Sequence, residues 1–294
     1  MNIHTIAIIL AGFFWGTNGF FCRILVEGGL TSNQVVFLRF LGATIFFCVA
    51  IFCTDKQQFK IKKQDIWCFL GSGFCSLLFF TACYFQAMNV LSLSAAAILL
   101  YTAPIFIAII SRVLFKEKFT FVKLLALALS FTGCILVCGV GNLSFSAKGI
   151  LLGLGAGLGY ALYSVFCKLA YERGYTNNTV NFYSCGLASI GCQILWNTSD
   201  SFLLISHSPF SITIAILCAF LGCFIPYMLY SYGITVVNIS KASILASIEL
   251  VTATVLGVVL YREVMNFYSI LGIIMILSAI FILNIKNLSQ KIDL

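Results

Sequence analysis

A single carboxylate stands in the middle of one long apolar stretch of the sequence. Glu249 lies near the centre of residues 240–261, which contain no other acidic side chain. A charged group in apolar surroundings is costly, and removal from water favours the protonated carboxyl. Glu249 is therefore a candidate proton carrier, or a partner for the amine of a substrate.

A structural explanation of Glu249 competes with the functional one. At helical spacing Glu249 shares a face with Ala242, Ala246 and Ala253. Small residues of this kind form tight helix interfaces, in which a protonated carboxyl is held by hydrogen bonds. Both explanations stay open at the level of the sequence.

Arg39 is the other charged side chain deep inside an apolar stretch, about two turns from the start of residues 33–53. Its guanidinium can bind a substrate carboxylate or another anion. It can also extend along its aliphatic stem to the membrane surface, or pair with Glu27. Of these, the structural role is the expectation.

Aromatic and amide side chains gather near the middle of several apolar stretches, as they do in cavity linings. Their rings can stack on the apolar parts of a small molecule, while hydroxyls and amides fix its orientation. The alternative is ordinary packing, with the tyrosines bonded to neighbouring carbonyls. Tyr227 belongs to the same general group of aromatic residues. The residues that we predict to bind a substrate are Trp15, Asn18, Tyr84, Gln86, Tyr101, Tyr160, Tyr163, Tyr230 and Glu249.

Two other kinds of chemistry lack support in the sequence. The histidines are His4 and His207, both away from the centres of the apolar stretches, and there is no HExxH motif or intramembrane aspartate pair. The 13 cysteines show no CxxC and no Cys/His metal-ligand spacing, and most fall where they act as small hydrophobic residues. We expect neither an enzyme nor a metal or other cofactor.

The composition requires a lipid environment. Of the 294 residues, 61% are apolar and only 9% are charged, whereas roughly a quarter of a globular protein is charged. The net charge of +8 does not indicate a nucleic-acid partner, because no basic cluster lies in a soluble segment large enough to fold. The expected partners are the lipid bilayer, a small-molecule substrate and protons.

Ten apolar stretches approach the roughly 20 residues that a membrane-spanning helix needs. The weakest is 179–197, where Asn181, Ser184 and Gln193 dilute the apolar run. The connections are short, so the expected fold is an all-α membrane protein without an extramembrane domain. The stretches are 3–26, 33–53, 66–88, 93–115, 120–140, 148–170, 179–197, 211–235, 240–261 and 267–285.

Lysine and arginine collect in alternate connections, which predicts the orientation. With a cytoplasmic N-terminus, the outer connections contain Arg23, Lys148 and Arg262. The inner ones contain Lys56, Lys60, Lys62, Lys63, Arg112, Lys116, Lys118, Lys123, Lys168, Arg173, Lys241, Lys286 and Lys291. By the positive-inside rule, we expect a multi-pass protein of the cell membrane with both termini in the cytoplasm.

The sequence repeats itself at about half its length. A shift of 145 residues aligns Gly12/Gly157, Cys22/Cys167, Glu27/Glu172, Asn33/Asn178 and Val35/Val180, and a shift of 146 aligns Tyr84/Tyr230, Ser94/Ser240 and Glu117/Glu263. A general likeness of membrane helices does not explain polar identities in one register. We predict two repeats, residues 1–142 and 143–294. Because each contains five spans, the second is inverted, as in secondary transporters.

These residues resemble the EamA-like ten-helix exporters of the drug/metabolite transporter superfamily. The resemblance covers nearly the whole chain, through the order, spacing and duplication of loose motifs. The motifs are WGTNGFFCRIL (15–25), FLRFLGA (37–43), SLSAAAILLYTAPIFIAIISRVLFKEKFT (92–120) and ISKASILASIELVTATVLGVVLYREVMN (239–266).

The resemblance implies export of amino acids or similar small metabolites, driven by protons or another gradient, with alternating access to a cavity at mid-depth. It also implies that Trp15, Tyr101 and Tyr160 line that cavity. The protein is expected as a monomer or a homodimer. A multispecific exporter of drugs, nucleobases or amines stays open, as does a passive channel, because some channels also contain inverted repeats.

The two halves differ at two positions. Leu250 stands where the first half has Pro104, so a helix irregularity is expected in the first half alone. Ser184 stands where the first half has Arg39. Gly149, Gly153 and Gly157 form a small-residue stripe for helix packing. Glu117 and Glu263, at opposite membrane faces, are either gate latches or interfacial anchors.

Overall fold

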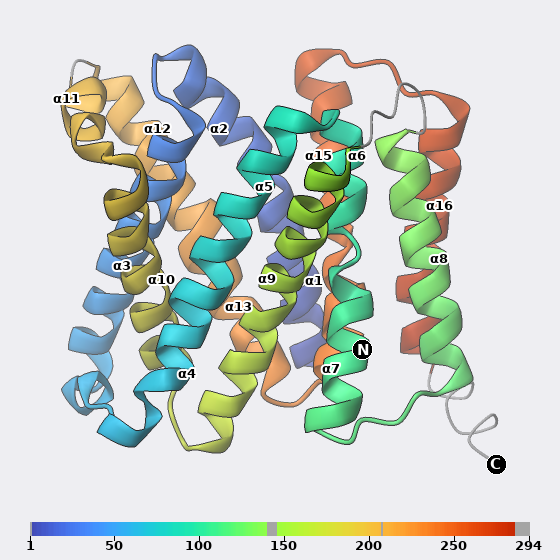
Figure 1. Ribbon diagram of the computed structural model, residues 1–294, viewed down its shortest axis with the longest axis horizontal. Coiled ribbons are helices and arrows are strands. Elements are labelled where there is room, and N and C mark those ends of the chain that lie inside the picture. Colours follow the sequence, from blue (N-terminus) through green and yellow to red (C-terminus); the bar gives the residue numbers. More distant parts are fainter. Residues whose placement is uncertain (1, 140–145, 207, 286–294) are drawn as a thin grey trace.

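The computed structural model describes residues 2–139, 146–206 and 208–285, and within them it contains helices and loops but no strand (Figure 1). Ten helical spans cross the described part of the molecule. They are α1 with α2 (Ile3–Gly16, Asn18–Glu27), α3 (Ser32–Thr54), α4 with α5 (Ile66–Leu70, Phe79–Val90), α6 with α7 (Leu93–Leu100, Ala103–Leu114), α8 (Phe121–Cys138), α9 (Ala147–Glu172), α10 (Asn177–Trp196), α12 with α13 (Pro209–Ala219, Ile225–Ile234), α14 with α15 (Ile239–Ala246, Ile248–Tyr261) and α16 (Phe267–Asn284). The predicted all-α membrane fold is confirmed.

Nine of the spans in the described residues are long and apolar enough to cross a membrane. The remaining one is α10, the span whose apolar run the sequence shows as diluted, and it still forms a continuous helix of 20 residues. The short helix α11 (Ser201–Ser206) connects it to α12. Packing against neighbouring helices therefore compensates for its polar residues.

Hydroxyl side chains begin several of the spans and fix their boundaries. Thr31 caps α3 in a capping box with Gln34, and Thr176, its equivalent in the repeat, caps α10 by accepting from the Thr179 amide. A side-chain oxygen at this position satisfies one of the amides that a helix start leaves free. The same caps in both halves explain why equivalent spans begin in the same register.

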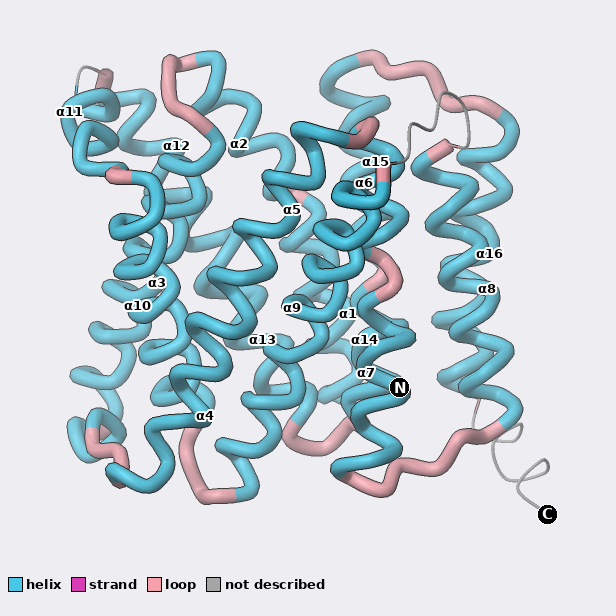
Figure 2. Tube along the Cα trace, in the orientation of Figure 1, coloured by secondary structure: helices cyan, strands magenta, loops and turns pink. Residues whose placement is uncertain are grey.

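The fourth and ninth spans are both broken at mid-depth, which corrects the expectation that the irregularity occurs in the first half alone. The break lies at Tyr101 and Thr102 between α6 and α7, and at Ser247 between α14 and α15 (Figure 2). Ser247 is the repeat equivalent of Tyr101. Proline is therefore not what breaks the ninth span.

Close contact with a glycine of the other half accompanies each break. A Cβ at Gly12 in α1 would lie 2.7 Å from the Ala246 carbonyl oxygen, and one at Gly157 in α9 would lie 3.0 Å from the Leu99 carbonyl oxygen. A side chain at either glycine would displace the backbone beside the break. The predicted glycine stripe of α9 packs here, with Gly153 directly against Leu99.

Equivalent helices of the two halves pack against each other in antiparallel pairs. Helix α3 packs against α10, and α8 packs against α16. In Figure 1 the connection from α7 to α8 lies at the lower edge, and its counterpart from α15 to α16 lies at the upper edge. The halves thus point in opposite directions, as the five-span repeat predicts.

One end of the molecule carries most of the lysines. We call the end formed by the α3–α4, α7–α8 and α9–α10 connections the basic face, and the other end the opposite face. The predicted contributions of Lys286 and Lys291, His207, and the repeat boundary at 142/143 lie outside the described residues.

Helix packing yields a stability test at Gly272. A Cβ at this position in α16 would lie 2.5 Å from the Gly133 carbonyl oxygen of α8, so we expect Gly272→Ala to lower the unfolding free energy by about 1–3 kcal/mol through overpacking. Denaturation of the purified protein in detergent measures this. Gly186→Ala is the control, because its nearest neighbour, Thr44 Cγ2, lies at 3.4 Å. Equal stability of the two variants would contradict the packing.

Candidate functional site

Glu249 lies in the first turn of α15, directly after the break at Ser247. The dipole and free amides of a helix N-terminus stabilise a negative charge, so the break itself creates a favourable place for the carboxylate. Glu249 faces a hollow of about 20 Å³, which is enough for roughly one water molecule. The other lining residues are Leu100, Tyr101, Ala103, Pro104, Tyr160, Ser243, Ala246 and Ser247.

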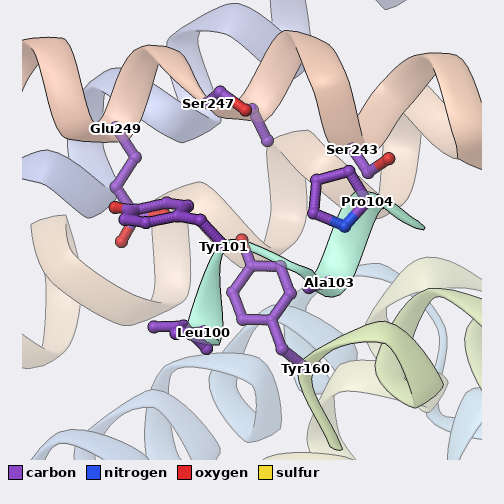
Figure 3. Close-up of a pocket in the computed structure, with 9 residues that line it drawn as sticks. Leu100, Tyr101, Ala103, Pro104, Tyr160, Ser243, Ser247 and Glu249 are labelled. Carbon is purple, nitrogen blue, oxygen red and sulfur yellow. The ribbon is translucent and has the colours of Figure 1, made fainter. Parts of the chain in front are cut away.

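Both halves contribute to this hollow. In Figure 3, Glu249, Tyr101 and Tyr160 extend toward it from three different elements. Tyr101 ends α6 at the first-half break, Tyr160 belongs to α9, and Glu249 begins α15. The residues that sequence reasoning selected from distant parts of the chain therefore meet where the two broken spans face each other.

A second hollow of about 20 Å³ lies on the other side of Tyr160, within a group of aromatic rings. The Trp15 ring lies 5.3 Å from that of Tyr227, 5.2 Å from that of Tyr230 and 6.4 Å from that of Tyr160. Tyr160 lines both hollows. Tyr160 is thus the residue that the linings of the Glu249 hollow and the aromatic hollow share.

Two of the predicted substrate-binding tyrosines already form hydrogen bonds with protein groups through their hydroxyls. Tyr163 donates to Asn181 Oδ1 at 2.5 Å, and Asn181 Nδ2 donates to Ser231 Oγ at 2.9 Å. The Tyr230 hydroxyl is hydrogen-bonded to Ser164 Oγ at 2.7 Å. In this conformation these tyrosines therefore hold helices together.

A larger cavity of about 180 Å³ lies between α2, α3, α5 and α12, toward the opposite face. We call it the Arg39 cavity. It includes two predicted substrate-binding residues, Asn18 and Tyr84. Its lining is Asn18, Gly19, Cys22, Val35, Val36, Arg39, Phe80, Thr81, Tyr84, Phe85 and Cys218.

Two sequence-level expectations differ from the structure. Gln86 is exposed and lines none of the three hollows described above, since it lies beyond the inward face of α5. Arg39 does not pair with Glu27, whose carboxylate lies 3.4 Å from Arg23. Asn181 is a polar group that the predicted site omits. Its position inside an apolar span was the available signal.

The two halves use equivalent positions differently. The first-half residues Asn18, Cys22, Val35, Val36 and Arg39 line the open cavity. Their equivalents at a shift of 145 are Tyr163, Cys167, Val180, Asn181 and Ser184, which are 0–4% exposed. At these positions the first half therefore lines a cavity, whereas the second half is closely packed.

The ion pairs between the halves also differ, in how far each is buried. At the basic face, Glu117 lies 3.5 Å from Lys168 and accepts hydrogen bonds from the Ile239 amide and the Ser240 hydroxyl, with its side chain 6% exposed. At the opposite face its equivalent, Glu263, lies 3.5 Å from Arg23, with its side chain 61% exposed. Arg23 is itself the equivalent of Lys168. Only the pair at the basic face is buried and fully bonded.

Comparisons with known proteins agree along the whole chain. The model of the EamA-like transporter family matches residues 2–139 and 147–285. A protein of Archaeoglobus fulgidus described as an uncharacterized transporter is 30% identical over 287 residues, 96% of each chain. The uncharacterized transporter YwfM of Bacillus subtilis is 22% identical over 292 residues, 99% of this chain and 96% of the relative. One crystal structure superposes with a TM-score of 0.80 at 16% identity and 99% coverage of both chains, which shows the same fold.

Thiol labelling tests the asymmetry between the halves. In single-cysteine variants, with the remaining cysteines changed to alanine, we expect Cys22 to react with a membrane-impermeant maleimide from the opposite face at least about tenfold faster than Cys167, because reactivity requires access. Cys22 lines the Arg39 cavity, and Cys167 is 0% exposed. Equal rates would show that the two halves are equally open.

Proposed function

Because the chain belongs to the EamA-like transporter family, we propose that this membrane-embedded transporter is a secondary carrier that exports amino acids or similar small metabolites by alternating access, driven by the proton gradient. The basic face is then the cytoplasmic face, following the positive-inside rule. Both termini lie on that side.

The position of Glu249 is the observation that carries this proposal. Its carboxyl lies at mid-depth where the breaks of both halves meet, in a hollow that holds roughly one water molecule and no metabolite. An intramembrane carboxyl in such a place is typical of proton pathways. We assign Glu249 to carry the proton and the surrounding aromatic residues to contact the substrate as the hollows widen.

Alternating access requires that the two ends open in turn. The inverted repeat supplies an equivalent ion pair at each end, and the pair at the basic face is the more buried of the two. We assign the Glu117–Lys168 pair as the latch of the basic face, and the Glu263–Arg23 pair as the latch of the opposite face. The burial of the second-half residues equivalent to the lining of the Arg39 cavity fits a carrier better than an open channel.

Glu249→Gln tests the coupling. In proteoliposomes, a gradient of one pH unit supplies about 1.4 kcal/mol for each proton, or about tenfold substrate accumulation. We expect the wild-type protein to accumulate an amino acid found by counterflow screening, and Glu249→Gln to exchange it without pH-driven accumulation. A neutral amide cannot release a proton on one side and bind one on the other.

Glu172→Gln is the matched control, because Glu172 is exposed at the end of α9. Unchanged accumulation by Glu249→Gln would remove Glu249 as the proton site. A complete lack of saturable uptake by the wild-type protein would count against a metabolite carrier of any kind.

Glu117→Ala tests the latch. Loss of the buried carboxylate removes roughly 2–3 kcal/mol from the state closed at the basic face. We therefore expect maleimide labelling of Cys167 from the basic face to rise at least about tenfold. Glu172→Ala serves as the control, and the same labelling rate in both variants would argue against a latch at Glu117.

A further inference from the structure

The Arg39 cavity contains two buried polar atoms that no group in the described residues satisfies. Neither Arg39 Nε nor Asn18 Oδ1 has a hydrogen-bond partner there. The guanidinium also has no carboxylate within 4.0 Å among residues 2–139, 146–206 and 208–285. Its aromatic neighbour is Phe40, with the ring centre at 5.3 Å. Asn18 Oδ1 is covered by protein next to Gly222, so the guanidinium of Arg39 is the polar group that this cavity leaves without a partner.

The repeat indicates that the fold does not require a charge at this point. Ser184 in α10 is the equivalent of Arg39, and its hydroxyl is bonded to the Val180 carbonyl at 2.7 Å and to Ser72 Oγ at 2.6 Å. A small neutral side chain therefore suits the same place in the scaffold. An unpaired buried guanidinium, in contrast, disfavours the empty state. A ligand that supplies the missing charge explains why Arg39 is there.

The lining defines the charge of that ligand. Arg39 is the one charged side chain among the residues that line the cavity. A single guanidinium balances a carboxylate, which it can bind through two parallel hydrogen bonds. A phosphate dianion would keep an unbalanced charge. The cavity chemistry thus favours a monoanionic carboxylate.

The remaining residues define the rest of the ligand. Asn18 also lines the cavity, and its amide nitrogen can donate a hydrogen bond to the same carboxylate. The rings of Phe80, Tyr84 and Phe85 offer an apolar surface. A volume of about 180 Å³ equals roughly six water molecules of liquid, which limits the ligand to a small metabolite.

From these observations, and on the basis of the proposed transport function, we infer that the Arg39 cavity is the subsite that binds the carboxylate of a small amino acid substrate. Arg39 binds the carboxylate, and the Asn18 amide nitrogen donates to it. The subsite receives the substrate when the carrier is open toward the opposite face, before or after its passage through the region of Tyr160.

Binding by the purified protein tests this subsite without transport. The melting temperature is measured in detergent with each of the common L-amino acids, with the corresponding carboxamides and with inorganic phosphate. A ligand that binds the folded state raises the melting temperature. We expect at least one amino acid to stabilise the protein, its carboxamide to bind at least about tenfold more weakly, and phosphate to have no effect.

Three variants separate ligand binding from folding. Arg39→Gln should lose the stabilisation by the amino acid and keep a ligand-free melting temperature at or above that of the wild type, because it removes an unpaired charge. Arg39→Lys should bind with intermediate affinity, since an ammonium lacks the planar fork. Lys148→Gln, an exposed cation at the same face, should behave like the wild type.

Several results would overturn the inference. They are equal stabilisation by an amino acid and its carboxamide, unchanged binding by Arg39→Gln, a lowered ligand-free melting temperature of that variant, stabilisation by phosphate alone, and stabilisation by no compound of the panel. The proposed function fails separately: Arg39-dependent binding without any transport would retain the subsite and exclude the carrier.

Discussion

Two contacts between a glycine and a backbone carbonyl hold the centre of this molecule together. Gly12 of the first half lies against the Ala246 carbonyl of the second, and Gly157 of the second half lies against the Leu99 carbonyl of the first. Each contact brings an unbroken stretch of helix against the segment just before a break. The breaks in turn place Tyr101 and Glu249 at the same depth, at the junction of the halves. The site at mid-depth is thus a product of contacts between the two repeats, and neither repeat contains it alone.

The two repeats share a backbone arrangement but carry different side chains at equivalent positions. Where the first half has Asn18, Val36 and Arg39 around a cavity, the second has the buried residues Tyr163, Asn181 and Ser184. Tyr163 donates to Asn181, and Ser184 donates to the Val180 carbonyl. Buried polar groups with hydrogen-bond partners stabilise one arrangement, whereas those without partners carry a desolvation cost that a bound ligand can remove. A ligand can then shift the balance between two conformations by its different affinity for each. The two halves therefore differ in their side chains at equivalent positions, although their backbones repeat.

Much of the fold could be predicted from periodic properties of the chain. The spans follow from apolar length, and the inverted halves follow from the repeat of residues such as Asn33 and Asn178. The break at Ser247 could not be predicted, because no proline marks it in the sequence and the close approach of Gly12 that accompanies it comes from a distant span. For the site, the aromatic residues converge as expected, since mid-depth positions face a shared centre. Gln86 does not, because it follows Tyr84 by two residues, which turns its side chain about 200° around the helix, away from the cavity. The sequence could not show that Arg39 lacks a partner, because Glu27 was an equally good candidate. In the structure the Glu27 carboxylate pairs with Arg23 instead.

The third and eighth spans each contain a π-helical segment, Gly71–Leu78 and Phe220–Phe224, at matching places in the repeat. A π-turn accommodates one residue more than an α-turn, and one residue corresponds to about 100° around the axis. Each of these spans therefore presents one side before the segment and a different side after it. Tyr84 and Tyr230, which follow the two segments, owe their direction to this extra residue. A related protein from which the extra residue of the π-helical segment was deleted would keep a membrane helix of ordinary length and hydropathy. Its equivalent tyrosine, however, would point away from the interior.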